Sequence, residues 1–369
     1  ETAIHNYVKQ QQSPIRTKAK LEIDTLGLPG EPLRNIKIAL VQLTNAWQAK
    51  LMSPTITGEV YFPNNPKHRP ILARLRHLRL ALPNTAPKIP PPKHFAYSSL
   101  PDPHQASALD LYVDDLQIDT TSMGKLFFKA RPQAMGLKIV QLMLNGSLFT
   151  ITGTGRWIGT PENQQTKLYV KGQSPNLGQA LRNLGFKSAL HQSSIQMQAN
   201  LHSSTSIYGL TPANLVGKIK FQLSKGYMID VDPGVGRFFG LISLEAIQRR
   251  LSLDFSDVFG KGFSFNSFDG LVTLKNGNAT TAGVEITGPI ANIVIRGRTG
   301  LVTQDYDQTI IVTPKISNTL PIAGALTSGP IGAAAMLLTK QIVGNEINQL
   351  AQFRYKLTGS WDKPEFEYR

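Results

Sequence analysis

Short segments in which apolar and polar residues alternate are the feature that most limits how this 369-residue chain can fold. Gly, Asn and Pro separate these segments along the sequence, as is typical of half-buried antiparallel strands. We predict strands over residues 21–26, 36–43, 58–62, 109–118, 125–130, 137–144, 148–157, 167–171, 193–201, 217–223, 227–231, 263–268, 271–275, 279–286, 290–297, 302–312, 348–358 and 365–368. The pattern therefore predicts a mainly β fold.

Helices and linkers interrupt this series at a few places. We predict helices over 176–184, 237–249 and 322–344, the first followed by a glycine where a left-handed cap is favoured. Residues 63–70 and 83–103 are rich in Pro and are expected to be extended loops or linkers. We therefore divide the chain into an N-terminal β segment, residues 1–104, and a C-terminal β domain, residues 105–369, that includes a hydrophobic helical segment over 316–344.

A weak internal repeat links two stretches of about 30 residues. Residues 124–157 and 270–300 both run through glycine, strand, turn, strand, glycine and strand. In the second copy Asn276 is followed by Gly277, which is a strong hairpin signal. A sheet that grows by adding such β-meander units can stay open as a trough.

Two late strands have one apolar and one solvated face. In 290–297 the apolar face carries Ala291, Ile293 and Ile295, and in 302–312 it carries Val302, Tyr306, Ile310 and Val312. Judged from the residues alone, a sandwich with its core between two sheets is favoured over an open trough.

Composition narrows the partners. Lys and Arg exceed Asp and Glu by 39 − 24 = 15, and the pI is about 9.9. This charge favours an anionic partner, which could be nucleic acid, acidic lipid or lipopolysaccharide. The alternative, a basic protein that binds no polyanion, is less favoured. The absence of Cys excludes disulfides, thiolate zinc sites, Fe–S clusters and a Cys nucleophile. No signal peptide or membrane anchor is visible, so we expect a fragment or a processed form with any anchor upstream.

No catalytic constellation emerges. A Gly-Val-Gly at 234–236 lacks the third glycine and the βαβ context of a dinucleotide loop. Asp254 and Asp257 have no supporting acid, base or ligand, and the seven His are scattered. The acidic cluster at residues 110–119 lacks the glycine and the spacing of a calcium loop. We expect no enzyme activity, no cofactor and no metal.

A basic stretch at residues 69–82 has two interpretations. Its four arginines, which form the candidate site for headgroups or other anions, are Arg69, Arg74, Arg76 and Arg79. They either hold phosphate groups or form an ordinary solvated strand face, which is favoured. No stacking aromatic residues are interleaved with them, which argues against nucleic acid.

Residues 316–339 contain no charge, and Lys340 follows them. The length permits a membrane span, but two prolines and several polar residues make it a poor one. A broken helix that lies in a membrane interface or plugs the end of a trough, and a helix buried under a sheet, remain as alternatives. The candidate membrane contacts, at helical spacing, are Ile331, Ala335, Leu338 and Ile342.

From about residue 231 the sequence resembles the AsmA-like superfamily, in its YhdP branch. The resemblance is carried by DPGVGR at 232–237, GLISL at 240–244, RRLSLDFSDVF at 249–259, KGFSF at 261–265, DYDQ at 305–308, LP at 320–321 and WDKP at 361–364. It weakens over 105–230 and is faint before that. Departures from the family pattern are Tyr208 for Trp, Gln248 for Pro, Asn266 for Asp and Gly300 for Asp, none of which alters a reacting group.

The resemblance implies a long antiparallel sheet of repeated β-meander units curled into an open hydrophobic groove, with a few short helices near the C-terminal end. Such a protein is a bridge-like lipid transfer protein: it stands in the Gram-negative periplasm, anchored in the inner membrane, and maintains the outer-membrane barrier. Its partners are phospholipids as cargo, both membranes and envelope proteins at either end, with no nucleic acid. The expected groove lining is Ile139, Leu142, Leu144, Ile293, Ile295, Val302, Tyr306, Ile310 and Val312.

Two other classes of function remain open at this point. One is a binding module for lipopolysaccharide or another anionic envelope polymer, which the net charge and the basic stretch at 69–82 support. The other is an envelope scaffold that transports nothing. Phospholipid that co-purifies with the chain would separate lipid transfer from both.

Overall fold

The computed structural model describes residues 17–26, 33–65, 69–80, 102–118, 121–184, 188, 190–228, 263–289, 291–315 and 352–368. Eighteen of its strands hydrogen-bond into one large sheet, and three more form a small second sheet. In the large sheet β1 at one edge pairs with β2, and β21 at the other edge pairs with β20, so the sheet stays open. The mainly β prediction is confirmed.

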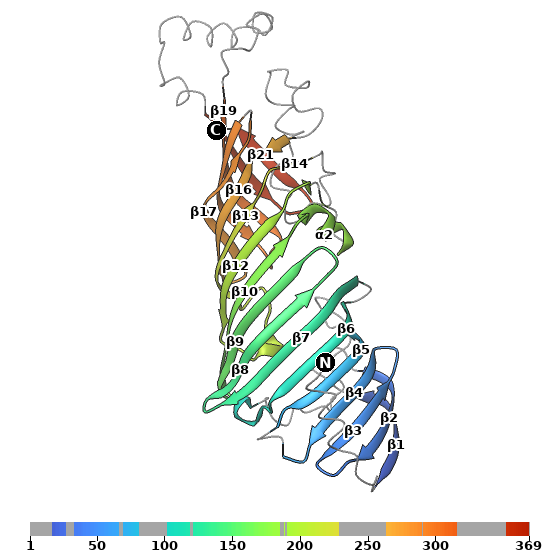
Figure 1. The fold of residues 1–369 in the computed structure, drawn as a ribbon. Coiled ribbons are helices and arrows are strands. Elements are labelled where there is room, and N and C mark those ends of the chain that lie inside the picture. The colour runs from blue at the N-terminus through green and yellow to red at the C-terminus, as the bar shows by residue number, and fades with distance from the viewer. Residues whose placement is uncertain are drawn as a thin grey trace, which may run out of the picture. The chain divides into compact units, whose positions relative to one another are not determined.

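The chain forms two compact units, and the first comprises Glu1–Gly172 and Asn200–Leu210. Its strands follow one another in chain order, from blue to green in Figure 1. They are β1 (Lys18–Leu26), β2 (Leu33–Gln42), β3 (Ala46–Met52), β4 (Ile56–Pro63), β5 (Ile71–Leu80), β6 (Leu109–Ile118), β7 (Thr121–Gln133), β8 (Gly136–Asn145), β9 (Thr150–Thr160) and most of β10 (Asn163–Ser174). Most neighbours are joined by short turns, as the predicted meander requires.

One pairing in this unit breaks the antiparallel pattern. β5 and β6 run parallel, with Ile71 opposite Leu109 and Leu80 opposite Ile118. Parallel neighbours need a long crossover, and the Pro-rich stretch between these strands supplies the length. The pairing joins strands from both sides of residue 104 in one sheet, while the division into 1–104 and 105–369 stays a prediction.

The second unit comprises Gln173–Ala199 and Thr211–Arg369. Its part of the large sheet contains most of β12 (Ile195–Ser203), then β13 (Val216–Leu223), β16 (Ser267–Lys275), β17 (Asn278–Thr287), β18 (Ala291–Gly300), β19 (Asp305–Pro314), β20 (Phe353–Gly359) and β21 (Pro364–Tyr368). The small sheet is formed by β11 (Leu190–His191), β14 (Gly226–Met228) and β15 (Phe263–Phe265). β13 pairs with β16 in the large sheet, and the two described strands between them in the chain, β14 and β15, belong to the small sheet.

One α-helix is present among the described residues, α2 (Leu177–Asn183). The Asn176 side chain accepts a hydrogen bond from the backbone N–H of Gln179 and caps its first turn. This helix was predicted. The helices expected at 237–249 and 322–344 lie outside the described residues, as do Asp254 and Asp257.

Candidate functional site

In the first unit the large sheet has one apolar face, and the pairing of residues between neighbouring strands identifies it. Phe128 lies opposite Leu142, Leu126 opposite Leu144, and Ala130 opposite Ile139. Residues directly opposite each other in a sheet point to the same side, and successive residues point to opposite sides. The predicted lining residues Ile139, Leu142 and Leu144 therefore share one face of β8.

Much of this face is only half-buried. A buried cluster of Val60, Ala73, Leu75, Val113 and Leu116 is surrounded by partly exposed side chains. The partly exposed members are Leu51, Ile56, Ile71, Leu78, Leu111, Met123, Leu126 and Leu144. Leu21 and Phe62, which register places on the same face, are 45% and 42% exposed. Apart from strands, the described elements of this unit are two single-turn helices, so most of the face has no described second layer.

These single-turn helices close one end of the apolar face. They are η1 (Pro103–Gln105) and η2 (Ile207–Gly209). Ala106 and Ile207 pack on the buried side chains of Ala130, Leu137 and Trp157. The Trp157 Nε1 donates a hydrogen bond of 2.8 Å to Gln164 Oε1, and its ring meets the Tyr208 ring edge-on at 5.6 Å. The apolar face around Trp157 is thus a small hydrophobic core covered by the residues next to the two single-turn helices.

Tyr208, which stands where the family pattern has Trp, is one of the aromatic residues of this closed end.

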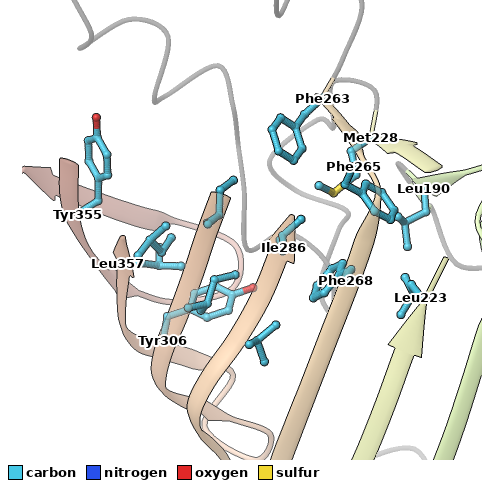
Figure 2. Close-up of a cluster of buried hydrophobic side chains, with 14 residues drawn as sticks. Leu190, Leu223, Met228, Phe263, Phe265, Phe268, Ile286, Tyr306, Tyr355 and Leu357 are labelled. Atoms are coloured by element: carbon cyan, nitrogen blue, oxygen red, sulfur yellow. The ribbon is translucent and has the colours of Figure 1, made fainter. Parts of the chain in front are cut away.

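A second layer covers much of the apolar face of the second unit. Leu190, Met228, Phe263 and Phe265 of the small sheet belong to one buried cluster with side chains of the large sheet, as Figure 2 shows. In the same cluster Ile293 is 2% exposed and Ile310 0%. The face that sequence marked as apolar is here the core between two layers.

The structure places the predicted lining residues in different surroundings. Ile295 lies opposite Ile310, and Ile293 opposite Val312, so these four do share one face. Ile293, Ile295, Tyr306 and Ile310 are buried in the core of the second unit, and Val312 packs against it. Leu142 and Leu144 are half-buried on the first unit's apolar face. Whether any of them lines a lipid groove stays a prediction.

The expected strand over 302–312 was wrong at its start. β19 begins at Asp305, and Val302 lies in the preceding turn with 57% of its surface exposed. The apolar residues at even positions begin at Val302, in the turn before the strand. The alternation of apolar and polar residues alone does not show where a strand begins. Val302 is therefore not part of the apolar face of β19.

The four candidate arginines lie on or beside β5. Arg74, Arg76 and Arg79 are exposed on the strand, and Arg69 is exposed in the loop before it. Arg74 lies opposite Glu59 on β4. Arg79 donates hydrogen bonds of 3.3 and 3.4 Å to Gln117 Oε1 on β6. Two of the four thus already face polar partners within the sheet.

In the acidic cluster at 110–119, Asp110 and Asp115 make unrelated contacts, and Asp119 lies outside the described residues. Asp110 Oδ1 accepts a hydrogen bond of 2.5 Å from Arg131 Nη1, while Asp115 Oδ2 lies 3.0 Å from His77 Nδ1. Partial burial acts to raise the pKa of Asp115, but hydrogen bonds from His77, Ser122 and Gln117 outweigh it and hold that pKa below its usual value. Within the described ranges no three acidic or His side chains gather in a way that would hold a metal ion.

The candidate membrane contacts Ile331, Ala335, Leu338 and Ile342 lie outside the described residues. Among the helices that the structure does describe, none has the length and apolar character needed to cross a bilayer.

Sequence reasoning missed several residues of the half-buried face, notably Ile38, Leu51, Leu111 and Leu126. The signal was present, because Ile38 and Leu111 fall in predicted strands with clear alternation. What the pattern did not show was which apolar faces would be covered by a second layer.

Comparison with known proteins gives the family. A sequence model described as YhdP protein matches residues 3–366 of the chain. The chain belongs to the YhdP family. The resemblance to the YhdP branch of the AsmA-like superfamily is therefore confirmed.

A curated relative is the Intermembrane phospholipid transporter YhdP of Escherichia coli (strain K12). It is 29% identical over 230 residues, which are 62% of this chain and 18% of that protein. This chain thus spans less than a fifth of the relative's length. The relative is named as a transporter and not as an enzyme, in agreement with the prediction that the chain catalyses no reaction. No solved structure matches the chain.

Proposed function

We propose that this chain is a section of a bridge-like protein that carries phospholipids between the inner and outer membranes of a Gram-negative cell, and so maintains the outer-membrane barrier. The half-buried apolar face of the first unit is the observation that carries this proposal. Membership of the YhdP family and the name of the Escherichia coli relative support phospholipid as the cargo.

The physical role of such a face is to replace water around acyl chains. Exposing a lipid tail to water costs about 0.8 kcal/mol for each methylene group. A face with side chains such as Leu142, Leu144 and Leu126 removes most of this cost without recognising any one lipid, since apolar contact is not directional. Cargo held in this way moves along the face and leaves it, as transport requires.

In this proposal the chain lies in the periplasm, as part of a protein anchored in the inner membrane. Its partners are phospholipids, the two membranes and envelope proteins at either end. Phospholipid is cargo here, and no cofactor takes part.

Crosslinking at adjacent positions of one strand tests the proposal. Leu144 lies on the apolar face of β8, and its neighbour Met143, opposite Phe127 and Thr152, points to the other face. A photo-activatable residue at position 144 should yield phospholipid adducts in cells, detected by mass spectrometry, and the same residue at position 143 should not. Equal labelling at both positions, or none at 144, would contradict acyl-chain contact at this face.

A further inference from the structure

Basic residues stand in line across the polar face of the first unit. Arg131 on β7 lies opposite Lys138 on β8, and Lys138 lies opposite Arg156 on β9. On β10, Lys167 is the exposed residue next to Leu168, whose side chain lies against Gly155 on the apolar side. Like charges directly opposite each other in a sheet destabilise it. The opposed cations on β7, β8 and β9 therefore repel one another, and this repulsion destabilises the sheet unless an anion offsets it.

The first member of the row is neutralised within the protein. Arg131 Nη1 lies 2.5 Å from Asp110 Oδ1. For Lys138, Arg156 and Lys167 no carboxylate of the described chain lies within ion-pair distance. The uncompensated charge is therefore confined to β8, β9 and β10.

These three cations surround a cavity of about 700 Å³. Its other side-chain walls are Gln133, Thr154, Tyr169, Asn200 and His202. All of these are exposed, and side chains alternate along each strand, so the walls belong to the polar face. The intervening residues Ile139, Gly155, Leu168 and Leu201 turn their side chains to the apolar face and form the floor. No Asp or Glu lines the cavity.

We propose that this cavity binds a phosphate group, carried by a lipid headgroup or by a small free phosphate. Arg156 offers the planar pair of donors that matches phosphate oxygens, and Lys138 and Lys167 add two point charges beside it. Thr154, Tyr169 and Asn200 supply neutral donors around the same space. A bound dianion offsets the repulsion between the opposed cations. The site lies on the face opposite the apolar one and does not rest on the proposed lipid transfer.

A pair of double variants tests the site. Lys138→Gln/Lys167→Gln removes two charges from the cavity, and Lys218→Gln/Lys220→Gln removes two from β13, where both lysines are exposed and line no part of the cavity. Binding of inorganic phosphate and of glycerol 3-phosphate to the purified chain is measured by calorimetry at fixed ionic strength. We expect saturable binding to the unmodified chain at one site. Affinity should fall on the order of tenfold or more in the cavity variant and stay unchanged in the β13 variant.

Vesicles separate the two sources of the phosphate group. The purified proteins are floated with phosphatidylcholine vesicles that contain phosphatidylglycerol. If the cavity variant no longer floats with the vesicles and the β13 variant still does, the phosphate group belongs to a lipid headgroup. Binding of inorganic phosphate and glycerol 3-phosphate without vesicle binding identifies a free phosphate. Equal losses in both double variants, or no saturable binding of any phosphate probe, would overturn the site. Because the apolar face is untouched, lipid crosslinking at position 144 should persist in the cavity variant.

Discussion

Arg298 and Asp305 form a two-pronged ion pair across the hairpin that joins β18 to β19. Arg298 Nη1 donates to Asp305 Oδ1 at 2.9 Å, and Nη2 donates to Oδ2 at 2.6 Å. Thr303 donates its hydroxyl to the same carboxylate. Gly300 fits beneath this pair, because a Cβ at that position would collide with the Asp305 and Thr303 side-chain oxygens. The departure from Asp to Gly at position 300 is thus accommodated by local packing.

This ion pair predicts an acid-sensitive hairpin. Hydrogen bonds from Arg298 lower the pKa of Asp305 from its usual value of 3.8 to about 2. Because the folded-state pKa lies below the unfolded-state value, the pair stabilises the fold fully above about pH 4, and this contribution is lost as pH falls toward 2. The Asp305 side chain is 35% exposed, so solvent screening limits the contribution to about 1 kcal/mol.

Asp305→Asn should therefore lower the free energy of unfolding at pH 7, as measured by urea denaturation followed by circular dichroism. The difference from the unmodified chain should shrink as pH falls toward 2 and vanish below pH 2. A difference that stays constant from pH 7 to pH 2 would show that the Asp305 charge is not responsible.

The turn at Asn276 and Gly277 gives a second prediction. Both residues have positive φ, +50° and +73°, as a two-residue hairpin turn requires. A Cβ at position 277 would also press on the Val302 side chain. Gly277→Ala should therefore destabilise the second unit by about 1 kcal/mol or more. Gly283→Ala is the matched control, since φ there is not in the left-handed region and the nearest atom to a new Cβ is 3.8 Å away.

Thermal melting of the two glycine variants side by side measures this difference. The control should melt at or above the temperature of the unmodified chain. Equal destabilisation by both changes would mean that turn geometry is not what position 277 requires.

Much of the fold was predictable from local pattern. The Asn276 turn and the apolar side of β18 each follow from a few neighbouring residues, and the structure confirms them. The strand β3 was missed, because Ala46 and Met52 lie on one face and Ala49 and Leu51 on the other, so hydrophobicity alternates weakly. The parallel pairing of β5 with β6 was also missed, since the pairing of distant segments has no local signal.

The surroundings of the candidate site were less predictable. Ile293 and Leu144 look alike in sequence, each on the apolar side of an alternating strand. Their burial differs because the small sheet that covers the Ile293 region comes from segments around residues 190, 228 and 263–265. The row Lys138–Arg156 was hidden for the same reason: it exists only once register places two hairpin strands side by side.

The closed end of the first unit predicts an energetic coupling. Trp157 Nε1 is buried and donates to Gln164 Oε1, so Gln164→Leu leaves a buried donor without this partner. Such a loss costs about 1–3 kcal/mol. Trp157→Phe removes the donor, and adding it to Gln164→Leu should cost less than the sum of the two single changes. Chemical denaturation of the four proteins in this cycle measures the coupling, and strict additivity would contradict it.

The last prediction contrasts the two apolar environments with one kind of substitution. Ile293→Asp places a carboxylate in a core where the native side chain is 2% exposed, beside Ile286 and Val312. An unpaired charge there costs several kcal/mol, so the second unit should unfold or melt far below the unmodified chain. Leu144→Asp places the same group on the half-buried face of the first unit, where water reaches it. That variant should keep its fold with a loss of about 1–2 kcal/mol, yet carry less phospholipid.

Thermal melting and mass spectrometry of organic extracts, both performed on each variant, measure the two effects together. A folded Ile293→Asp protein with its phospholipid content reduced would mean that this face opens to lipid in the second unit as well. A folded Leu144→Asp protein with an unchanged lipid load would remove β8 from the lipid-carrying face. The combination expected here, unfolding in one variant and lipid loss in the other, requires a closed core and an accessible apolar face on the same sheet.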